Sequence, residues 1–131
     1  MTSQVNPNLS DEQKRVLFEQ GTELPGSGLL LDESRRGVYG CANCGALLFR
    51  SESKYESATP GLVGWPSFAE AASNEALILA PDTSLGMPRT EVTCAKCGAH
   101  LGHLFTGVDD HPSGNHFCIN SCALNFKEKL G

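Results

Sequence analysis

The sequence lacks a long hydrophobic run, an excess of positive charge and a dense set of cysteines. Its apolar runs, such as Leu29–Leu31 and Ala76–Ala80, are far shorter than the ~20 residues of a membrane-spanning helix. Ten basic residues stand against 15 acidic ones, and the net charge of -5 disfavours nucleic acid as a partner. No basic start leads into a signal-type apolar stretch, so we expect a cytoplasmic protein that binds neither membranes nor nucleic acid.

Six cysteines in 131 residues are too dilute for a disulfide scaffold, so we expect them to stay reduced unless a metal or a reaction uses them. The length corresponds to one domain, which we assign to residues 10–131, after a flexible N-terminus at 1–9. Fourteen glycines, seven prolines and short β-branched and aromatic runs predict a mainly β fold, α+β only at the margins.

Local patterns predict one short helix near the N-terminus and several strands. Ser10 and Gln13 form a capping box that begins the helix, which buries Val16 and Leu17 and ends at Gly21. Strands are expected at Leu77–Leu79, Glu91–Thr93 and His116–Asn120. The long loop at 57–67 is expected to carry function, because loops of this length rarely serve only as connections.

Four of the cysteines lie in two similar motifs, Cys-Ala-Asn-Cys-Gly at 41–45 and Cys-Ala-Lys-Cys-Gly at 94–98. A two-residue gap lets a tight turn, or knuckle, aim both sulfurs of a pair at one point, and four thiolates complete the tetrahedral shell of a structural zinc ion. The glycine after each pair can adopt a positive φ, which lets backbone amides turn toward the sulfurs. Two separate redox CxxC motifs are the alternative. We predict one structural zinc per chain, with no open position for catalysis, held by Cys41, Cys44, Cys94 and Cys97.

Cys118 lies outside this quartet and has polar residues near it in the sequence. Strand alternation places His116, Cys118 and Asn120 on one face and the apolar residues between them on the other. A strand with such a face beside a cleft suits nucleophilic thiol chemistry. An ordinary thiol has a pKa near 8.5, and a protonated His116 close by would stabilise the thiolate. The alternative is an inert buried cysteine flanked by surface polar residues.

Further motifs follow one another in a consistent order along residues 10–127. They are Gly21-Thr22-Glu23, Gly64-Trp65-Pro66-Ser67-Phe68, Gly86-Met87, Arg89-Thr90-Glu91-Val92, the two cysteine pairs, His100-Leu101-Gly102-His103 and Cys118-Ile119-Asn120-Ser121. In these motifs the chain resembles the methionine sulfoxide reductases of the B type, which reduce the R epimer of methionine sulfoxide. The resemblance implies a fold of two antiparallel β-sheets, with the zinc site away from the active cleft.

The resemblance also implies roles for single residues. Cys118 would attack the sulfoxide sulfur, giving methionine and a cysteine sulfenic acid. His100 and His103 would position and protonate the sulfoxide oxygen, which is a poor leaving group until it is protonated. Trp65, held in a rigid loop by its neighbours, would pack on the substrate methyl group. The predicted site comprises catalytic Cys118, His103, His100, Asn120 and His116, and substrate-binding Trp65, Gly64, Pro66, Phe68 and Phe117.

Two departures from the family pattern concern charge near the site. His116 stands where the family usually has an arginine, and a histidine can lose its charge whereas an arginine cannot. Gly107 replaces the usual acidic residue, with Asp109 and Asp110 as candidate substitutes. Activation of the thiol is therefore expected to depend more on pH in this chain.

A third departure concerns turnover, because Val63 stands where many members place the resolving cysteine. Cys122 is the other cysteine that the zinc quartet leaves over, and we retain it as a candidate resolving residue. In an extended strand its Cα would lie ~13 Å from that of Cys118, whereas a disulfide tolerates at most ~7 Å. We therefore favour direct reduction by an external thiol such as thioredoxin or glutathione.

The resemblance implies a peptide-methionine (R)-S-oxide reductase that repairs oxidised proteins under oxidative stress. Its substrate would be methionine sulfoxide in proteins or peptides, with free methionine sulfoxide as a further candidate; a monomer without an organic cofactor is expected. A non-catalytic zinc-ribbon binding module is the alternative, although the basic residues are scattered along the chain. Zinc-dependent hydrolysis or deamination needs an open metal position, which a four-cysteine site excludes.

Overall fold

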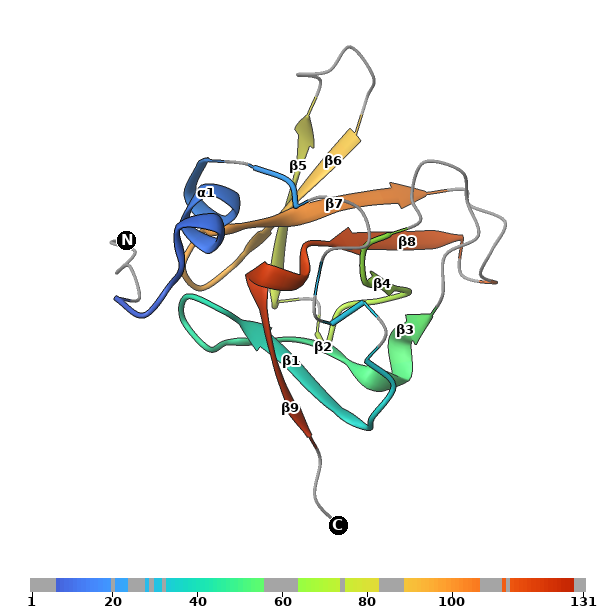
Figure 1. The fold of residues 1–131 in the computed structure, drawn as a ribbon. Coiled ribbons are helices and arrows are strands. Elements are labelled where there is room, and N and C mark those ends of the chain that lie inside the picture. The colour runs from blue at the N-terminus through green and yellow to red at the C-terminus, as the bar shows by residue number, and fades with distance from the viewer. Residues whose placement is uncertain are drawn as a thin grey trace.

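The computed structural model describes residues 7–19, 21–23, 28, 30–31, 33–55, 64–73, 75–82, 89–106, 112 and 114–128. Within these residues the chain forms one α-helix, α1 (Asp11–Glu19), and nine strands in two sheets (Figure 1). In this described part, no helix has the length and apolar character needed to cross a membrane.

The two sheets differ in size, and all of their strand pairs are antiparallel. The smaller sheet has the order β2-β1-β9 and the larger has the order β3-β4-β8-β7-β6-β5. The strands are β1 (Gly37–Cys41), β2 (Leu47–Arg50), β3 (Lys54–Tyr55), β4 (Ser67–Phe68), β5 (Leu77–Asp82), β6 (Arg89–Cys94), β7 (His100–Thr106), β8 (Asn115–Ile119) and β9 (Leu124–Glu128). Two short 3-10 turns, η1 (Ser51–Ser53) and η2 (Ser121–Ala123), precede β3 and β9. The predicted mainly β fold of two antiparallel sheets and a short N-terminal helix is confirmed.

Helix α1 begins with the predicted capping box. The Gln13 amide donates to the Ser10 hydroxyl at 3.1 Å, and the Ser10 amide donates to the Gln13 side-chain oxygen at 2.8 Å. Val16 and Leu17 are buried, as the pattern predicts. Leu9, which we assigned to the flexible N-terminus, is buried with them in the core. The helix thus docks on the larger sheet through its own apolar residues and the one that precedes its cap.

The hydrophobic core is built from aromatic rings of both sheets. Phe49 of β2 stacks on Phe68 of β4 with ring centroids 4.3 Å apart, and Phe117 of β8 packs edge-on against Phe49 at 5.7 Å. Full burial of such a ring contributes roughly 1.5–3 kcal/mol, so these contacts hold the strand register. Because strand residues alternate between faces, Ser67 and Cys118, next to two of these rings in sequence, project to the opposite face of the larger sheet.

Candidate functional site

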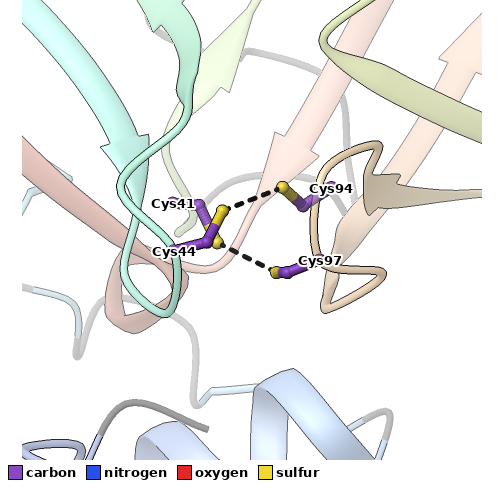
Figure 2. Close-up of side chains that lie close together, drawn as sticks. All are labelled: Cys41, Cys44, Cys94 and Cys97. Atoms are coloured by element: carbon purple, nitrogen blue, oxygen red, sulfur yellow. Dashed lines mark hydrogen bonds between the residues drawn. The ribbon is translucent and has the colours of Figure 1, made fainter. Parts of the chain in front are cut away.

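The four paired cysteines converge on one point (Figure 2). Cys41 ends β1 and Cys94 ends β6, their partners lie in the turns that follow, and all four sulfur atoms lie within 4.8 Å of one another. The sulfurs of Cys41 and Cys97 are 3.7 Å apart, and those of Cys44 and Cys94 are 3.5 Å apart. Sulfurs bound at about 2.3 Å to a tetrahedral metal ion are ~3.8 Å apart, so this spacing fits such an ion. The predicted convergence of the quartet is confirmed.

The two cysteine turns have the same backbone geometry. The Gly45 amide donates to the Cys41 carbonyl at 2.8 Å, and the Gly98 amide donates to the Cys94 carbonyl at 2.7 Å. Gly45 and Gly98 have φ values of +81° and +78°, in the left-handed region that favours glycine. A hydrogen bond from the Cys41 thiol, followed by two backbone amides of its own turn, lowers the pKa of Cys94 to about 5. Cys94 is therefore favoured as a thiolate, the form that binds a metal, whereas the hydrogen bond to Cys94 raises the pKa of Cys41 and burial raises that of Cys44.

Cys118 lies in β8, between two neighbouring strands of the larger sheet. Ser67 of β4 is its partner on one side and His103 of β7 is its partner on the other. Glu91 of β6 is in turn the partner of His103. Side chains of directly paired antiparallel residues project to the same face, so these four form one polar row across the sheet. The structure thus brings two of the predicted site residues, Cys118 and His103, side by side.

A β-bulge in β7 decides where His100 lies. The register between β6 and β7 shifts at Leu101, which is the extra residue of the bulge. In a regular strand, His100 and His103 would lie on opposite faces because they are three residues apart. With the bulge, both rings lie on the face of Cys118, and their centroids are 5.4 Å apart. A second predicted histidine thereby joins the row.

Glycine at position 102 allows β7 and β8 to approach closely. A Cβ at Gly102 would collide with the carbonyl oxygen of Cys118. The residue before His103 must therefore lack a side chain, so that the histidine strand can lie against the cysteine strand.

The backbone of Glu23 holds two more predicted site residues. Its amide donates to Oδ1 of Asn120 at 3.0 Å, and its carbonyl accepts a hydrogen bond from Nε1 of Trp65 at 3.0 Å. The Asn120 carboxamide also donates to the carbonyl of Leu101, the bulge residue, at 2.9 Å. Asn120 thus ties the bulge to the Glu23 segment. We did not predict Glu23 as a site residue; its presence in a motif of the resemblance was the available signal.

The segment before β4 carries Trp65 beside the cysteine strand. Trp65 is half-buried, and Gly64 before it has a φ of 115°, which an L side chain rarely adopts. The Pro66 carbonyl accepts a hydrogen bond from the amide of Ile119, the residue after Cys118, at 3.0 Å. The backbone on both sides of Trp65 is therefore fixed, which holds the indole in place.

His116 contacts the polar row through Ser67, the strand partner of Cys118. It is fully buried, and its Nε2 lies 2.8 Å from the hydroxyl of Ser67. Burial, and then the nearby carboxylate of Glu23, raise the pKa of Cys118 to about 12. At neutral pH this environment keeps Cys118 as a thiol, because apolar surroundings and a neighbouring negative charge both disfavour the thiolate.

Two predicted substrate-binding residues lie elsewhere. Phe68 and Phe117 are part of the core around Phe49 and project away from the face of Cys118, because each is one residue out of step with the polar row. Other positions that we singled out lie outside the described residues: 57–63 of the long loop, Val63 among them, and Gly107, Asp109 and Asp110.

Cys122 lies in η2, away from the polar row. Its amide donates to Oε1 of Glu23 at 3.1 Å, and its carbonyl accepts a hydrogen bond from the Gln13 side chain at 3.1 Å. Burial, and then the carboxylates of Glu23 and Glu12, raise its pKa to about 12. It lines a cavity of about 500 Å³ whose described lining does not include Cys118.

Known proteins with similar sequences show the family of this chain. A family model described as "SelR domain" matches residues 9–128. The peptide methionine sulfoxide reductase MsrB of Leifsonia xyli subsp. xyli is 53% identical over 119 residues, which cover 91% of this chain and 83% of that protein. The MsrB of Thiobacillus denitrificans is 46% identical over 127 residues, covering 97% and 92%. The mitochondrial methionine-R-sulfoxide reductase B2 of Danio rerio is 47% identical over 128 residues, covering 92% and 68%.

The chain belongs to the methionine sulfoxide reductase B family. The resemblance seen in the sequence motifs is thereby confirmed, and the match covers nearly the whole chain. Among solved structures, the crystal structure of the Mis18 "Yippee-like" domain matches with a TM-score of 0.56 at 14% identity, covering 74% of this chain and 99% of that chain. At this identity the likeness concerns the fold alone.

Proposed function

We propose that the chain reduces methionine R-sulfoxide in oxidised proteins and peptides through Cys118, and that an external thiol restores the enzyme. Its family makes the chain a peptide-methionine (R)-S-oxide reductase. The observation that carries the site assignment is the polar row, in which Cys118 has His103 as its strand partner and His100 on the same face. No other cysteine of the described residues has imidazoles beside it in this way.

In the first half-reaction the sulfoxide oxygen moves from the substrate to the enzyme. The Cys118 sulfur attacks the sulfoxide sulfur and forms a transient S–S bond. The oxygen then passes to the cysteine sulfur as a hydroxyl group, the substrate S–O bond and the S–S bond break, and the products are methionine and a sulfenic acid on Cys118. The substrate sulfur gains two electrons, and the cysteine sulfur loses two. Because the pKa of Cys118 is raised to about 12, the thiol keeps its proton until the sulfoxide binds. Transfer of a proton to the sulfoxide oxygen through His103 or His100 makes that oxygen a better leaving group.

Trp65 and Asn120 support this reaction in different ways. The Trp65 ring offers an apolar face for the sulfoxide methyl group, and its hydrogen bond to the Glu23 carbonyl holds the ring in place. Both ends of the Asn120 carboxamide are already bonded to backbone groups, so we assign Asn120 a positioning role. It secures the chain after Cys118 to the bulge that orients His100.

The cysteine cluster is proposed as a structural zinc site with one ion per chain. Four sulfur donors at tetrahedral spacing suit zinc, and they leave no position for a reacting water. Bound zinc would supply folding free energy here and no step of the reaction. Because Cys41 ends β1 and Cys94 ends β6, the ion would link the smaller sheet to the larger one.

Restoration of Cys118 is proposed to use an external thiol directly, with thioredoxin or glutathione as candidates. Cys122 faces a cavity whose described lining excludes Cys118, and both of its backbone polar groups are held by hydrogen bonds. After one turnover without reductant, mass spectrometry should find a trappable sulfenic acid on Cys118. Cys122→Ser should keep the wild-type rate with dithiothreitol. A Cys118–Cys122 disulfide, or loss of turnover in this variant, would contradict direct reduction.

The substrate assignment is tested with peptides that carry each sulfoxide epimer. The metal-loaded chain with dithiothreitol should convert the R epimer to methionine and leave the S epimer untouched, since one pocket geometry aligns only one configuration of sulfur with Cys118. Conversion is followed by mass loss of the peptide. If neither epimer is converted, the non-catalytic binding module becomes the better description. Cytoplasmic location and monomeric state stay predictions, and one relative is named as mitochondrial.

A further inference from the structure

We infer that Glu91 is a positioning residue for the reduction, because its carboxylate holds His100 so that only one ring nitrogen, Nε2, is left for the substrate. This rests on the proposed function. Glu91 belongs to β6, two strands away from Cys118, and its place in the motif Arg89-Thr90-Glu91-Val92 is the one sequence signal that it carries.

Glu91 and His100 form a close pair with little exposure to water. Nδ1 of His100 lies 2.8 Å from Oε2 of Glu91, and the two side chains are 5% and 17% exposed. The direct strand partner of Glu91 is His103, so the carboxylate reaches along β7 to His100 on the same face. The bulge at Leu101 makes this diagonal contact possible, since it puts both histidines on the face of Glu91.

The chemistry of this contact limits what His100 can do. An ionised carboxylate only accepts hydrogen bonds, so Nδ1 of His100 carries a proton. The ring is then presented through Nε2, which accepts a hydrogen bond when the imidazole is neutral and donates one when it is protonated. In the protonated ring, Nε2–H can give its proton to the sulfoxide oxygen while Glu91 balances the charge of the imidazolium.

A second observation points to a ligand at the same nitrogen. Nε2 of His100 is buried and has no hydrogen-bond partner within the described structure, whereas buried polar atoms are nearly always paired. A sulfoxide oxygen bound above Cys118 would provide that partner. Without Glu91, the ring could adopt either tautomer and either flip, and only part of the molecules would present the required nitrogen.

A purely structural role for the pair is the competing explanation, and kinetics separate the two. We expect Glu91→Gln to lower the single-turnover rate for an R-sulfoxide peptide by about 10- to 100-fold, less than the ~10⁴-fold effect of changing the orienting carboxylate of a serine protease triad. KM should change little, because the group acts on orientation and proton delivery. Glu75→Gln, at an exposed glutamate just before β5, is the matched control and should keep the wild-type rate.

Nitrogen NMR of His100 supplies a readout that does not depend on activity. In the wild-type chain, Nδ1 should carry the proton; in Glu91→Gln the two tautomers should mix, and Glu91→Asp should restore part of the wild-type signal and rate. The inference is overturned if wild-type His100 is protonated only on Nε2, or if Glu91→Gln keeps both rate and tautomer. The wild-type spectrum decides even if the variant does not fold. Failure of the proposed function is a different result, in which the wild-type chain leaves the R epimer unreduced.

Discussion

Cys118→Ser is expected to abolish reduction of the R-sulfoxide, with a loss of at least ~10⁴-fold in turnover, as when other enzymes lose their nucleophile. A hydroxyl is a weaker nucleophile than a thiol, and its oxygen cannot take up the sulfoxide oxygen as sulfur does. The fold should survive, because Cys118 projects from the polar face while its neighbour Phe117 packs in the core. Turnover is measured with the R-sulfoxide peptide and dithiothreitol.

The matched control is the other cysteine outside the cluster. Cys122→Ser carries the same chemical change at a residue that lies outside the polar row, and this variant should retain turnover. Metal content and melting temperature of both variants should equal those of the wild-type chain. Persistent activity in Cys118→Ser would overturn the assignment of the nucleophile even though the family stands.

Loss of the metal is expected to unfold the chain. Zinc bound by four cysteines contributes roughly 10–16 kcal/mol in small zinc domains, as much as or more than the roughly 5–15 kcal/mol by which typical domains are stable. The cluster joins the end of β1 to the end of β6, so its loss removes a link between the two sheets. Cys94→Ser, or treatment with a strong chelator, should give a protein without cooperative melting.

Metal analysis and circular dichroism check this together. The wild-type chain should hold one zinc ion and melt cooperatively, and Cys118→Ser should behave in the same way, because its thiol lies outside the cluster. A fully folded wild-type chain that contains no metal would refute the structural zinc site.

Local patterns predicted the elements that short-range chemistry controls. The capping box at Ser10 and Gln13 and the glycines after each cysteine pair all depend on neighbours a few residues away. The strands at β5, β6 and β8 were predicted within a few residues, because their apolar alternation is local too. Strand β9 was not predicted: Leu124–Glu128 takes its form from pairing with β1, more than 80 residues away in the chain.

In the candidate site, too, some residues could be predicted from local sequence and others could not. Cys118 and the four metal-ligand candidates were recognisable in the sequence, since thiol spacing and strand alternation are written in neighbouring residues. The roles of Glu23 and Glu91 were not, because neither contact follows from local spacing. The Glu23 peptide bonds to Trp65 and Asn120, far away in the chain, and the Glu91 carboxylate reaches His100 only because β6 pairs with the bulged strand β7. Phe68 and Phe117 lie in the core, on the face that strand alternation already gives to the residues beside Ser67 and Cys118.

Amino-acid order thus sufficed for the family and for the convergence of the cysteine quartet, because both depend on residue type and spacing, and it predicted Cys118 as the reacting thiol. Which imidazoles stand beside that thiol depended on long-range assembly. One unpaired residue in β7, Leu101, moves His100 onto the face of Cys118, and the bulge exists only where β7 is paired with β6. A single-residue change of register reverses every side chain beyond it, and no local pattern records where such a change occurs.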